Sequence, residues 1–221
     1  TKLENKHISK ITPIISPIDL KNQFPIQSPL SDFVINSRNT ISNIATKKDS
    51  RKLVIIGPCS IHDPAAALEY AKRLSKYVEK FKDKLYIVMR VYFEKPRTNI
   101  GWKGLISDPD LNNTCNIESG LKQARSLMLE ILKLNIPTGS ELLDPILPQY
   151  YADLICWASI GARTSESQTH REMASGLSMP IGFKNATDGN IDIAIHAIQA
   201  AQHSHSFIGV TQNGTIARVQ S

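Results

Sequence analysis

The sequence predicts an α/β protein built from parallel strand–helix units. From residue 53 onward, short apolar runs alternate with helical patterns across short connections. The stretch 53–221 has room for about five units at roughly 31 residues each, the unit size of an eight-stranded barrel. Near its end, Gln212-Asn213-Gly214 separates two strand-like runs, and its Asn-Gly pair indicates a β-hairpin. We therefore favour a TIM-type (β/α)8 barrel, represented by its first five units plus a hairpin, over an open doubly wound sheet.

An N-terminal arm is predicted to precede this partial barrel, and we expect any catalytic residues to lie in the barrel. The arm covers residues 1–52, is polar and rich in proline, and has one weak helical stretch at about 31–45. The barrel covers 53–221. Its strands are expected at 53–57, 85–93, 138–143, 157–162 and 181–184, and the hairpin strands at 206–211 and 215–220. Its helices are expected at 64–81, 118–134, 148–154, 168–176 and 191–201.

The first barrel helix has the clearest start signal. Asp63 is suited to cap a helix, and Pro64 is suited to its first helical position. An amphipathic pattern then continues to about Phe81. The element therefore follows its strand as a βα unit requires.

Composition excludes several classes of function. The chain carries a net charge of +6, with 17 Lys and 9 Arg, but no basic stripe interleaved with aromatic residues. We therefore expect no nucleic-acid partner. No apolar run approaches the ~18 residues of a membrane span, and the first twenty residues lack a signal peptide's apolar core, so no membrane partner is expected. Three scattered cysteines favour a reduced, cytoplasmic location.

Charged residues follow the predicted strands at the ends where barrel active sites are found. Such sites use side chains from the carboxyl ends of several strands. The residues at these positions are Cys59, Arg90, Glu141, Arg163 and Lys184, with Lys95 and Arg97 in the loop after the second strand. So many cations on one rim favour a dense anion, such as a phosphate with a carboxylate. No glycine-rich nucleotide loop is present.

Each of these residues also has a structural interpretation. A single strand-end Arg is more often an ion-pair partner, and a buried Cys is usually a small apolar residue. Cys59 differs because a Gly-Pro turn exposes it, so it is a candidate nucleophile or metal ligand. Either Glu141 or Asp144 faces the rim. We interpret Cys115 and Cys156 as structural residues. His62 either tunes the site or caps the turn, and His170 lies either on the surface or behind the residues that line the site.

Five motifs together resemble those of the microbial type I 3-deoxy-D-arabino-heptulosonate 7-phosphate (DAHP) synthases. They are GPCSIHD at 57–63, VMR through EKPRT at 88–98, GWKGL at 101–105, GART through ESQ at 161–168, and GFKN before TDG at 182–189. The resemblance covers essentially the whole chain, including the arm.

The resemblance implies a reaction and a set of roles. The family condenses phosphoenolpyruvate with erythrose 4-phosphate and releases phosphate, the first step towards aromatic amino acids. By motif, Cys59 corresponds to a ligand of a divalent metal (Mn, Fe, Co or Zn). Arg97 and Thr98 correspond to erythrose phosphate contacts. The phosphoenolpyruvate contacts correspond to Arg90, Lys95, Glu141, Ala162, Arg163 and Lys184, of which Arg90, Lys95 and Lys184 are expected to be catalytic.

The resemblance also implies regulation by an aromatic amino acid and a homo-oligomer. The arm is expected to take part in both. The effector region corresponds to Pro148, Gln149, Ser178, Phe207 and Gly209, and the alternative is that these residues only pack the hairpin. Many relatives carry serine where this chain has Gly209, so the effector's identity stays open.

The family's other metal ligands (a His, a Glu and an Asp) and one further Arg would fall beyond Ser221. We therefore expect this stretch to be incomplete and inactive by itself. Two alternatives remain open. One is a non-catalytic half-barrel remnant. The other is a phosphosugar-binding module or a Schiff-base aldolase using Lys184.

Overall fold

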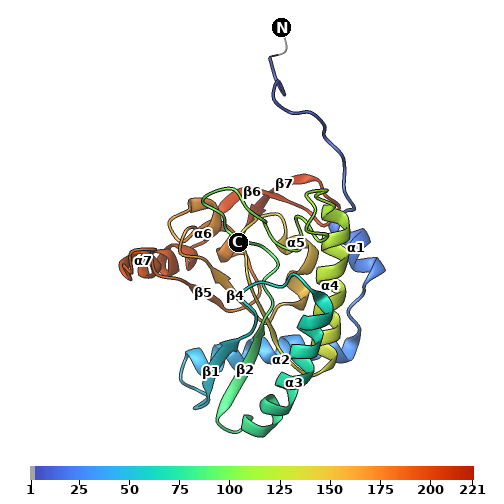
Figure 1. Ribbon diagram of the computed structural model, residues 1–221. Coiled ribbons are helices and arrows are strands. Elements are labelled where there is room, and N and C mark those ends of the chain that lie inside the picture. Colours follow the sequence, from blue (N-terminus) through green and yellow to red (C-terminus); the bar gives the residue numbers. More distant parts are fainter. Residues whose placement is uncertain (1–2) are drawn as a thin grey trace.

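Five parallel strands form one curled sheet in the computed structural model, which describes residues 3–221 (Figure 1). The strands pair in chain order, each with the next. They are β1 (Lys52–Ile56), β2 (Leu85–Arg90), β3 (Thr138–Glu141), β4 (Trp157–Ile160) and β5 (Ile181–Phe183). A doubly wound sheet would reverse its strand order at a switch point. The unbroken order therefore confirms the partial barrel.

Helices connect the strands and cover the outer face of the sheet (Figure 1). They are α3 (Pro64–Phe81), α4 (Ile117–Lys133), α5 (Pro148–Tyr151) with the 3-10 turn η1 (Ala152–Leu154), α6 (Gln168–Ser175) and α7 (Asp192–Ala201). Each lies close to its predicted position. The strands end one to three residues earlier than predicted, because the chain leaves the sheet where it turns into the rim loops.

The start of α3 follows from two residues, as predicted. The Asp63 Oδ1 atom accepts hydrogen bonds from the amides of Ala65 and Ala66 at 2.8 and 3.2 Å, and Pro64 occupies the first turn. The spacing of Ala67, Ala71 and Leu74 then places all three on the buried face of the helix.

The predicted hairpin is present as β6 (Ser206–Val210) and β7 (Ile216–Gln220). Its turn differs from the two-residue turn that an Asn-Gly pair favours. Thr211 N donates to Thr215 O at 2.8 Å, so three residues form the loop, and Gly214 has a φ of +82°. This is the pattern of a three-residue hairpin loop, in which only the last residue needs a left-handed backbone.

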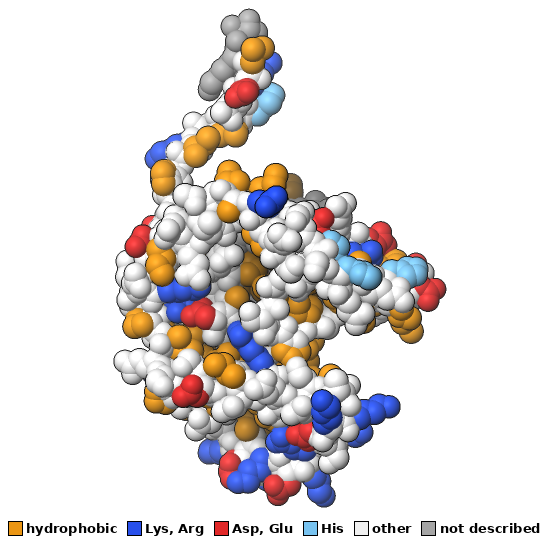
Figure 2. Space-filling model, turned by 180° about the vertical axis from the view of Figure 1, so that it is seen from behind, with side chains coloured by type: hydrophobic (Ala, Val, Ile, Leu, Met, Phe, Trp, Pro, Cys, Tyr) orange, Lys and Arg blue, Asp and Glu red, His pale blue; other side chains and the backbone are white. Residues whose placement is uncertain are grey.

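The predicted arm has two parts, apart from residues 1–2, which lie outside the described residues. Residues 3–14 are exposed and extend away from the body (Figures 1 and 2). Two helices follow, α1 (Pro17–Gln23), which was not predicted, and α2 (Ser28–Ala45). Leu20 of α1 is fully buried. On α2, the Arg38 side chain donates to the carbonyl of Ile155, just before β4, so α2 lies against the amino-terminal ends of the strands.

None of the helices in the described part of the chain has both the length and the apolar character that a membrane crossing requires.

Candidate active site

A cavity of about 260 Å³ opens at the carboxyl ends of the strands. The structure brings together most of the residues predicted at this rim, four of them cationic. The lining residues are Cys59, Ser60, Arg90, Tyr92, Glu94, Lys95, Pro96, Arg97, Glu141 and Arg163. We call this the rim cavity. It is smaller than the roughly 300–1,000 Å³ typical of drug-sized ligands, which suits a small anion.

The guanidinium of Arg90, at the end of β2, is fixed by backbone carbonyls. Its Nε donates to Pro58 O at 3.1 Å and its Nη2 to Cys59 O at 3.2 Å. Gly57 lets the backbone of the turn pass close to the backbone of Arg90, because a Cβ there would lie 2.7 Å from Arg90 O. The Gly-Pro turn after β1 therefore orients the first cation of the rim.

Lys184 follows β5 and pairs with Glu141 at the end of β3. Lys184 Nζ lies 2.9 Å from Glu141 Oε2. Gly161 leaves room for this carboxylate, since a Cβ there would lie 2.0 Å from Glu141 Oε1. The prediction left open which acidic residue faces the rim. It is Glu141, which lines the cavity, whereas the Asp144 Oδ1 atom accepts from the amide of Ile146 in the turn before α5.

Tyr92 is a rim residue that the sequence analysis missed. Its ring lies under the Arg90 guanidinium carbon at 3.7 Å from the ring centroid and 5.3 Å from Lys184 Nζ. Its hydroxyl is 2.8 Å from the Ser159 hydroxyl of β4. An aromatic face attracts cations, so the ring holds both charges near one another. The i, i+2 spacing of Arg90 and Tyr92 in extended chain was the available signal.

Glu94 is the second missed residue, and it is a buried carboxylate. It accepts hydrogen bonds from the amides of Leu143 and Asp144 and from the hydroxyl of Tyr151. Burial raises the pKa of Glu94 from its ordinary 4.5 to about 7, and the backbone bonds oppose this rise. The sequence offered only a weak signal, a carboxylate directly after an apolar run.

Cys59 is exposed, and its thiol lies beside Lys95. The Lys95 ammonium donates to Cys59 Sγ at 3.2 Å, and this contact lowers the pKa of the Cys59 thiol. No group of three or more His, Cys, Asp or Glu side chains within residues 3–221 is arranged to hold a metal ion. The described residues therefore do not by themselves fit a metal centre, although Cys59 is a suitable single ligand.

The other predicted residues surround the cavity. Arg163 lines it from an exposed position after β4, and the neighbouring Ala162 is half-buried. Arg97 lines it too, with its Nε donating to Trp102 O at 2.8 Å. Thr98 is exposed in the same loop but is not a lining residue.

His62 and His170 have different surroundings. His62 is exposed just before the cap of α3. His170 lies in α6, with Nδ1 at 2.8 Å from the Ser167 hydroxyl and Nε2 at 2.6 Å from Leu143 O. His170 therefore supports the loop after β3, in line with its predicted supporting role.

Comparison with known proteins identifies the family of this chain. The family model described as the DAHP synthetase I family matches residues 20–220. This chain belongs to the DAHP synthetase I family. It is 51% identical over 99% of its length to the Tyr-sensitive phospho-2-dehydro-3-deoxyheptonate aldolase of Escherichia coli K12. It is 54% identical over 96% of its length to the Trp-sensitive enzyme of Buchnera aphidicola from Acyrthosiphon pisum.

A solved structure has the same fold as this member of the DAHP synthetase I family. It is that of phospho-2-dehydro-3-deoxyheptonate aldolase from Francisella tularensis SCHU S4, with a TM-score of 0.95 and 49% identity, covering 97% of this chain and 63% of that one. The chain spans 62% of the E. coli protein and 61% of the Buchnera protein.

A second cavity of the DAHP synthetase I chain, about 320 Å³, lies beside α5. We call it the α5 cavity. Three residues of the predicted effector region line it, namely Pro148, Gln149 and Ser178. Phe207 and Gly209 of the hairpin are not among its lining residues. The Phe207 ring lies near Gly176, at 4.0 Å from where a Cβ would be, and Gly176 does line the cavity. Four of the five residues predicted for the effector region therefore lie at or near the α5 cavity.

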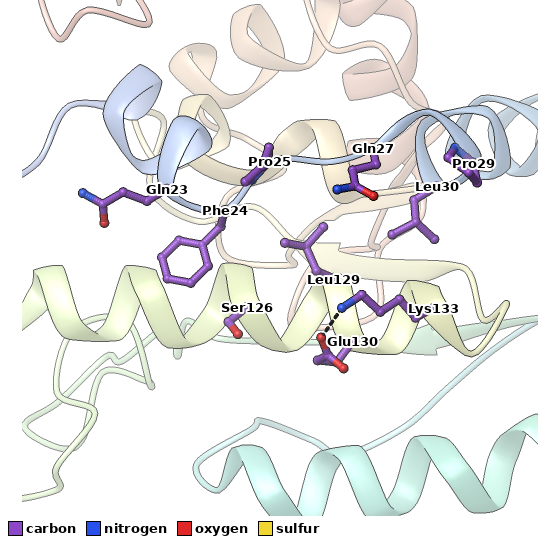
Figure 3. A pocket seen from close by; sticks show the side chains of 10 residues that line it. All are labelled: Gln23, Phe24, Pro25, Gln27, Pro29, Leu30, Ser126, Leu129, Glu130 and Lys133. Carbon is purple, nitrogen blue, oxygen red and sulfur yellow. Dashed lines mark hydrogen bonds and ion pairs between the residues drawn. The ribbon is translucent and has the colours of Figure 1, made fainter.

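A third cavity of about 410 Å³ lies between α4 and the segment that joins α1 to α2 (Figure 3). Phe24 and Leu129 are among its apolar lining residues. Its lysine, Lys133, already pairs with Glu130 at 2.6 Å. A small anion would find far less positive charge here than in the rim cavity.

Proposed function

We propose that this chain provides the substrate-binding part of a DAHP synthase, which condenses phosphoenolpyruvate and D-erythrose 4-phosphate with water to DAHP and phosphate. The observation that carries the proposal is the rim cavity, where four cationic side chains converge on a space that suits a small anion. Membership of the family supports the same reaction.

The proposed reaction gives a binding and orienting role to the cations that line the cavity and to Lys184, which is not a lining residue but pairs with the lining residue Glu141. C3 of phosphoenolpyruvate bonds to the aldehyde carbon of erythrose 4-phosphate, water oxygen adds at C2, and the C2–O bond to phosphate breaks. Arg90 and Arg163 offer planar forks for phosphate or carboxylate, and Lys95 and Lys184 act as point charges. Arg90 and Lys184 are held by their neighbours before substrate arrives, so they need little reorganisation to neutralise its charge.

Arg97 and Thr98 are the proposed contacts for the phosphate of erythrose 4-phosphate. Both are in the exposed loop beside the rim cavity, where a second anionic substrate can approach the first. A divalent metal is the cofactor implied by the family. Because the described residues do not form a metal centre, we assign no step to it.

The α5 cavity is the proposed effector site, and an aromatic amino acid is the proposed effector. The names of two relatives, Tyr-sensitive and Trp-sensitive, support this class of ligand. The effector region is proposed to include Phe207 and Gly209 of the hairpin. We also propose that the protein forms a homo-oligomer and is located in the cytoplasm.

The surroundings of Lys184 support this proposal over a Schiff-base aldolase. A Schiff-base lysine works as a neutral amine in an apolar pocket. Lys184 instead pairs with Glu141 and faces the Tyr92 ring. A lysine beside a carboxylate and an aromatic ring is not in an apolar pocket, so we expect borohydride with substrate to trap no adduct at Lys184.

Calorimetric titration of the chain tests the proposal. We expect phosphoenolpyruvate to bind at least about tenfold more tightly than pyruvate, because the phosphate adds charge-assisted hydrogen bonds worth ~1.5–3 kcal/mol each. Inorganic phosphate should compete with it. Equal affinity for pyruvate and phosphoenolpyruvate, or no binding of either, would contradict the proposal and favour the non-catalytic remnant.

A further inference from the structure

We propose that Glu94 is a positioning residue, whose buried carboxylate ties the loop carrying Lys95 and Arg97 to the loop after β3. The tie would hold both cations at the rim cavity. This inference rests on the proposed function for the identity of the substrate. The contacts on which it depends are independent of that function.

The carboxylate of Glu94 is held by three donors from one distant segment. Oε1 accepts from the amide of Asp144 at 3.0 Å, and Oε2 accepts from the amide of Leu143 at 3.3 Å and the hydroxyl of Tyr151 at 3.2 Å. Glu94 is only 8% exposed. A buried carboxylate is costly unless donors surround it, so the three bonds account for its presence here.

The loop that Glu94 begins, residues 94–103, is closed by its own bonds. Lys95 N donates to Lys103 O at 2.8 Å, and Arg97 Nε donates to Trp102 O at 2.8 Å. No residue from 94 to 103 belongs to a helix or strand. These internal bonds shape the loop, whereas the carboxylate of Glu94 links it to a neighbouring unit of the barrel.

The segment that binds Glu94 leads directly to the α5 cavity. The Asp144 Oδ1 atom accepts from the amides of Ile146 and Leu147 at 2.7 and 3.3 Å and so forms the turn that precedes α5. Pro148 and Gln149 of that helix line the α5 cavity. Glu94 therefore lies between the loop that lines one cavity and the helix that lines the other.

Substitution of Glu94→Gln tests the role, because glutamine has nearly the same shape but only one acceptor oxygen for three donors. At pH 8 we expect the amides of Leu143 and Asp144 to exchange hydrogen about tenfold faster. We expect phosphoenolpyruvate to bind about tenfold more weakly. Exchange within β4 should stay unchanged. Tyr151→Phe, which removes one donor, should give smaller changes of both kinds. Glu130→Gln, at an exposed ion pair, should give none.

The outcomes separate this inference from the proposed function. Unchanged exchange at Leu143 and Asp144 in the Glu94→Gln protein would overturn the tie, and faster exchange with unchanged affinity would overturn the positioning role. If the unmodified chain does not bind phosphoenolpyruvate, the proposed function fails by itself. The acylation rate of Lys95, read by peptide mass, then decides. A change of threefold or more in Glu94→Gln supports positioning, and an unchanged rate overturns it.

Discussion

The rim cavity and the α5 cavity both contain charged side chains, but these charges are used differently. Arg38 in the α5 cavity donates to the carbonyls of Ala152 and Ile155 at 2.7 and 2.9 Å. Asp153 is bound by both terminal nitrogens of Arg125. Arg163 in the rim cavity, by contrast, has no hydrogen-bond or ion-pair partner among residues 3–221.

This difference shows why a count of charges is a poor guide to a binding site. A guanidinium that bonds to backbone carbonyls joins elements of the fold, and only its remaining N–H groups can reach a ligand, as those of Arg90 can in the rim cavity. An exposed guanidinium beside other cations is open to an anion. The two cavities should therefore respond in opposite ways to loss of an arginine, in stability at one and in ligand affinity at the other.

The largest effect is expected from Arg125→Met, which breaks the ion pair between a buried arginine and the partly buried Asp153 near the α5 cavity. The Arg125 side chain is 1% exposed and also donates to the carbonyls of Phe24 and Tyr150, so it joins α4, α5 and the segment after α1. Leaving Asp153 without its partner should lower the free energy of unfolding by about 3–5 kcal/mol. Urea denaturation measures this loss.

Arg73→Met is the matched control, because Arg73 and its partner Glu69 are both exposed. An exposed pair contributes about 0–1 kcal/mol, so this variant should unfold almost as the unmodified chain does. Similar losses in the two variants would contradict the structural role assigned to Arg125.

Features of the fold that depend on neighbouring residues in the chain could be predicted from the sequence. The barrel order and α3 were predictable, because apolar periodicity and the Asp63-Pro64 pair act locally. Even α1 had a local signal, since the Ser16 hydroxyl accepts from the Asp19 amide and Pro17 follows it. The helix has only seven residues, too few for its periodicity to stand out.

The role of Glu94 could not be read from its neighbours in the chain. Its donors lie about 50 residues away, in a loop whose position depends on the pairing of β2 with β3. The rim cations were found because strand ends converge in every such barrel. The folded loops alone determine which of these cations also bond to the protein, as Arg90 does through two of its nitrogens to the carbonyls of Pro58 and Cys59.

The next largest effect is a pH dependence carried by Glu94. Asp144 and Tyr151 face its carboxylate, and burial is the main cause of its raised pKa of about 7. Because the folded pKa exceeds the ordinary 4.5, this group favours the fold below pH 4.5 and loses that contribution as the pH rises through 7. Relative to Glu94→Gln, the unmodified chain should lose about 3 kcal/mol of unfolding free energy between pH 4 and 8. Urea denaturation across this range measures the difference, and parallel curves would contradict it.

A pair of arginine variants compares the two cavities directly. Arg163→Gln should weaken phosphoenolpyruvate binding by about 10- to 100-fold with little change in stability, because it removes donors that the fold does not use. Arg38→Gln should destabilise the chain by about 2 kcal/mol and leave that affinity unchanged, because it leaves two carbonyls without donors. Calorimetric titration measures the affinity of each variant for phosphoenolpyruvate, and urea denaturation measures the free energy of unfolding of each. Loss of affinity in both variants would contradict the separation of roles.

The smallest effect is expected in the hairpin, at Gly209→Ser. A Cβ there would lie 2.7 Å from Cγ2 of Val219, on the paired strand, so the two side chains must adjust. Because the obstacle is a methyl group on a rotatable side chain and not backbone, the cost should be only about 1 kcal/mol. Val219→Ala in the same chain should recover most of that loss, and a double-mutant cycle measures the coupling. Additive losses would mean that the hairpin strands separate instead of repacking. The Phe207 ring, which lies near Gly176 of the α5 cavity, would then move with them.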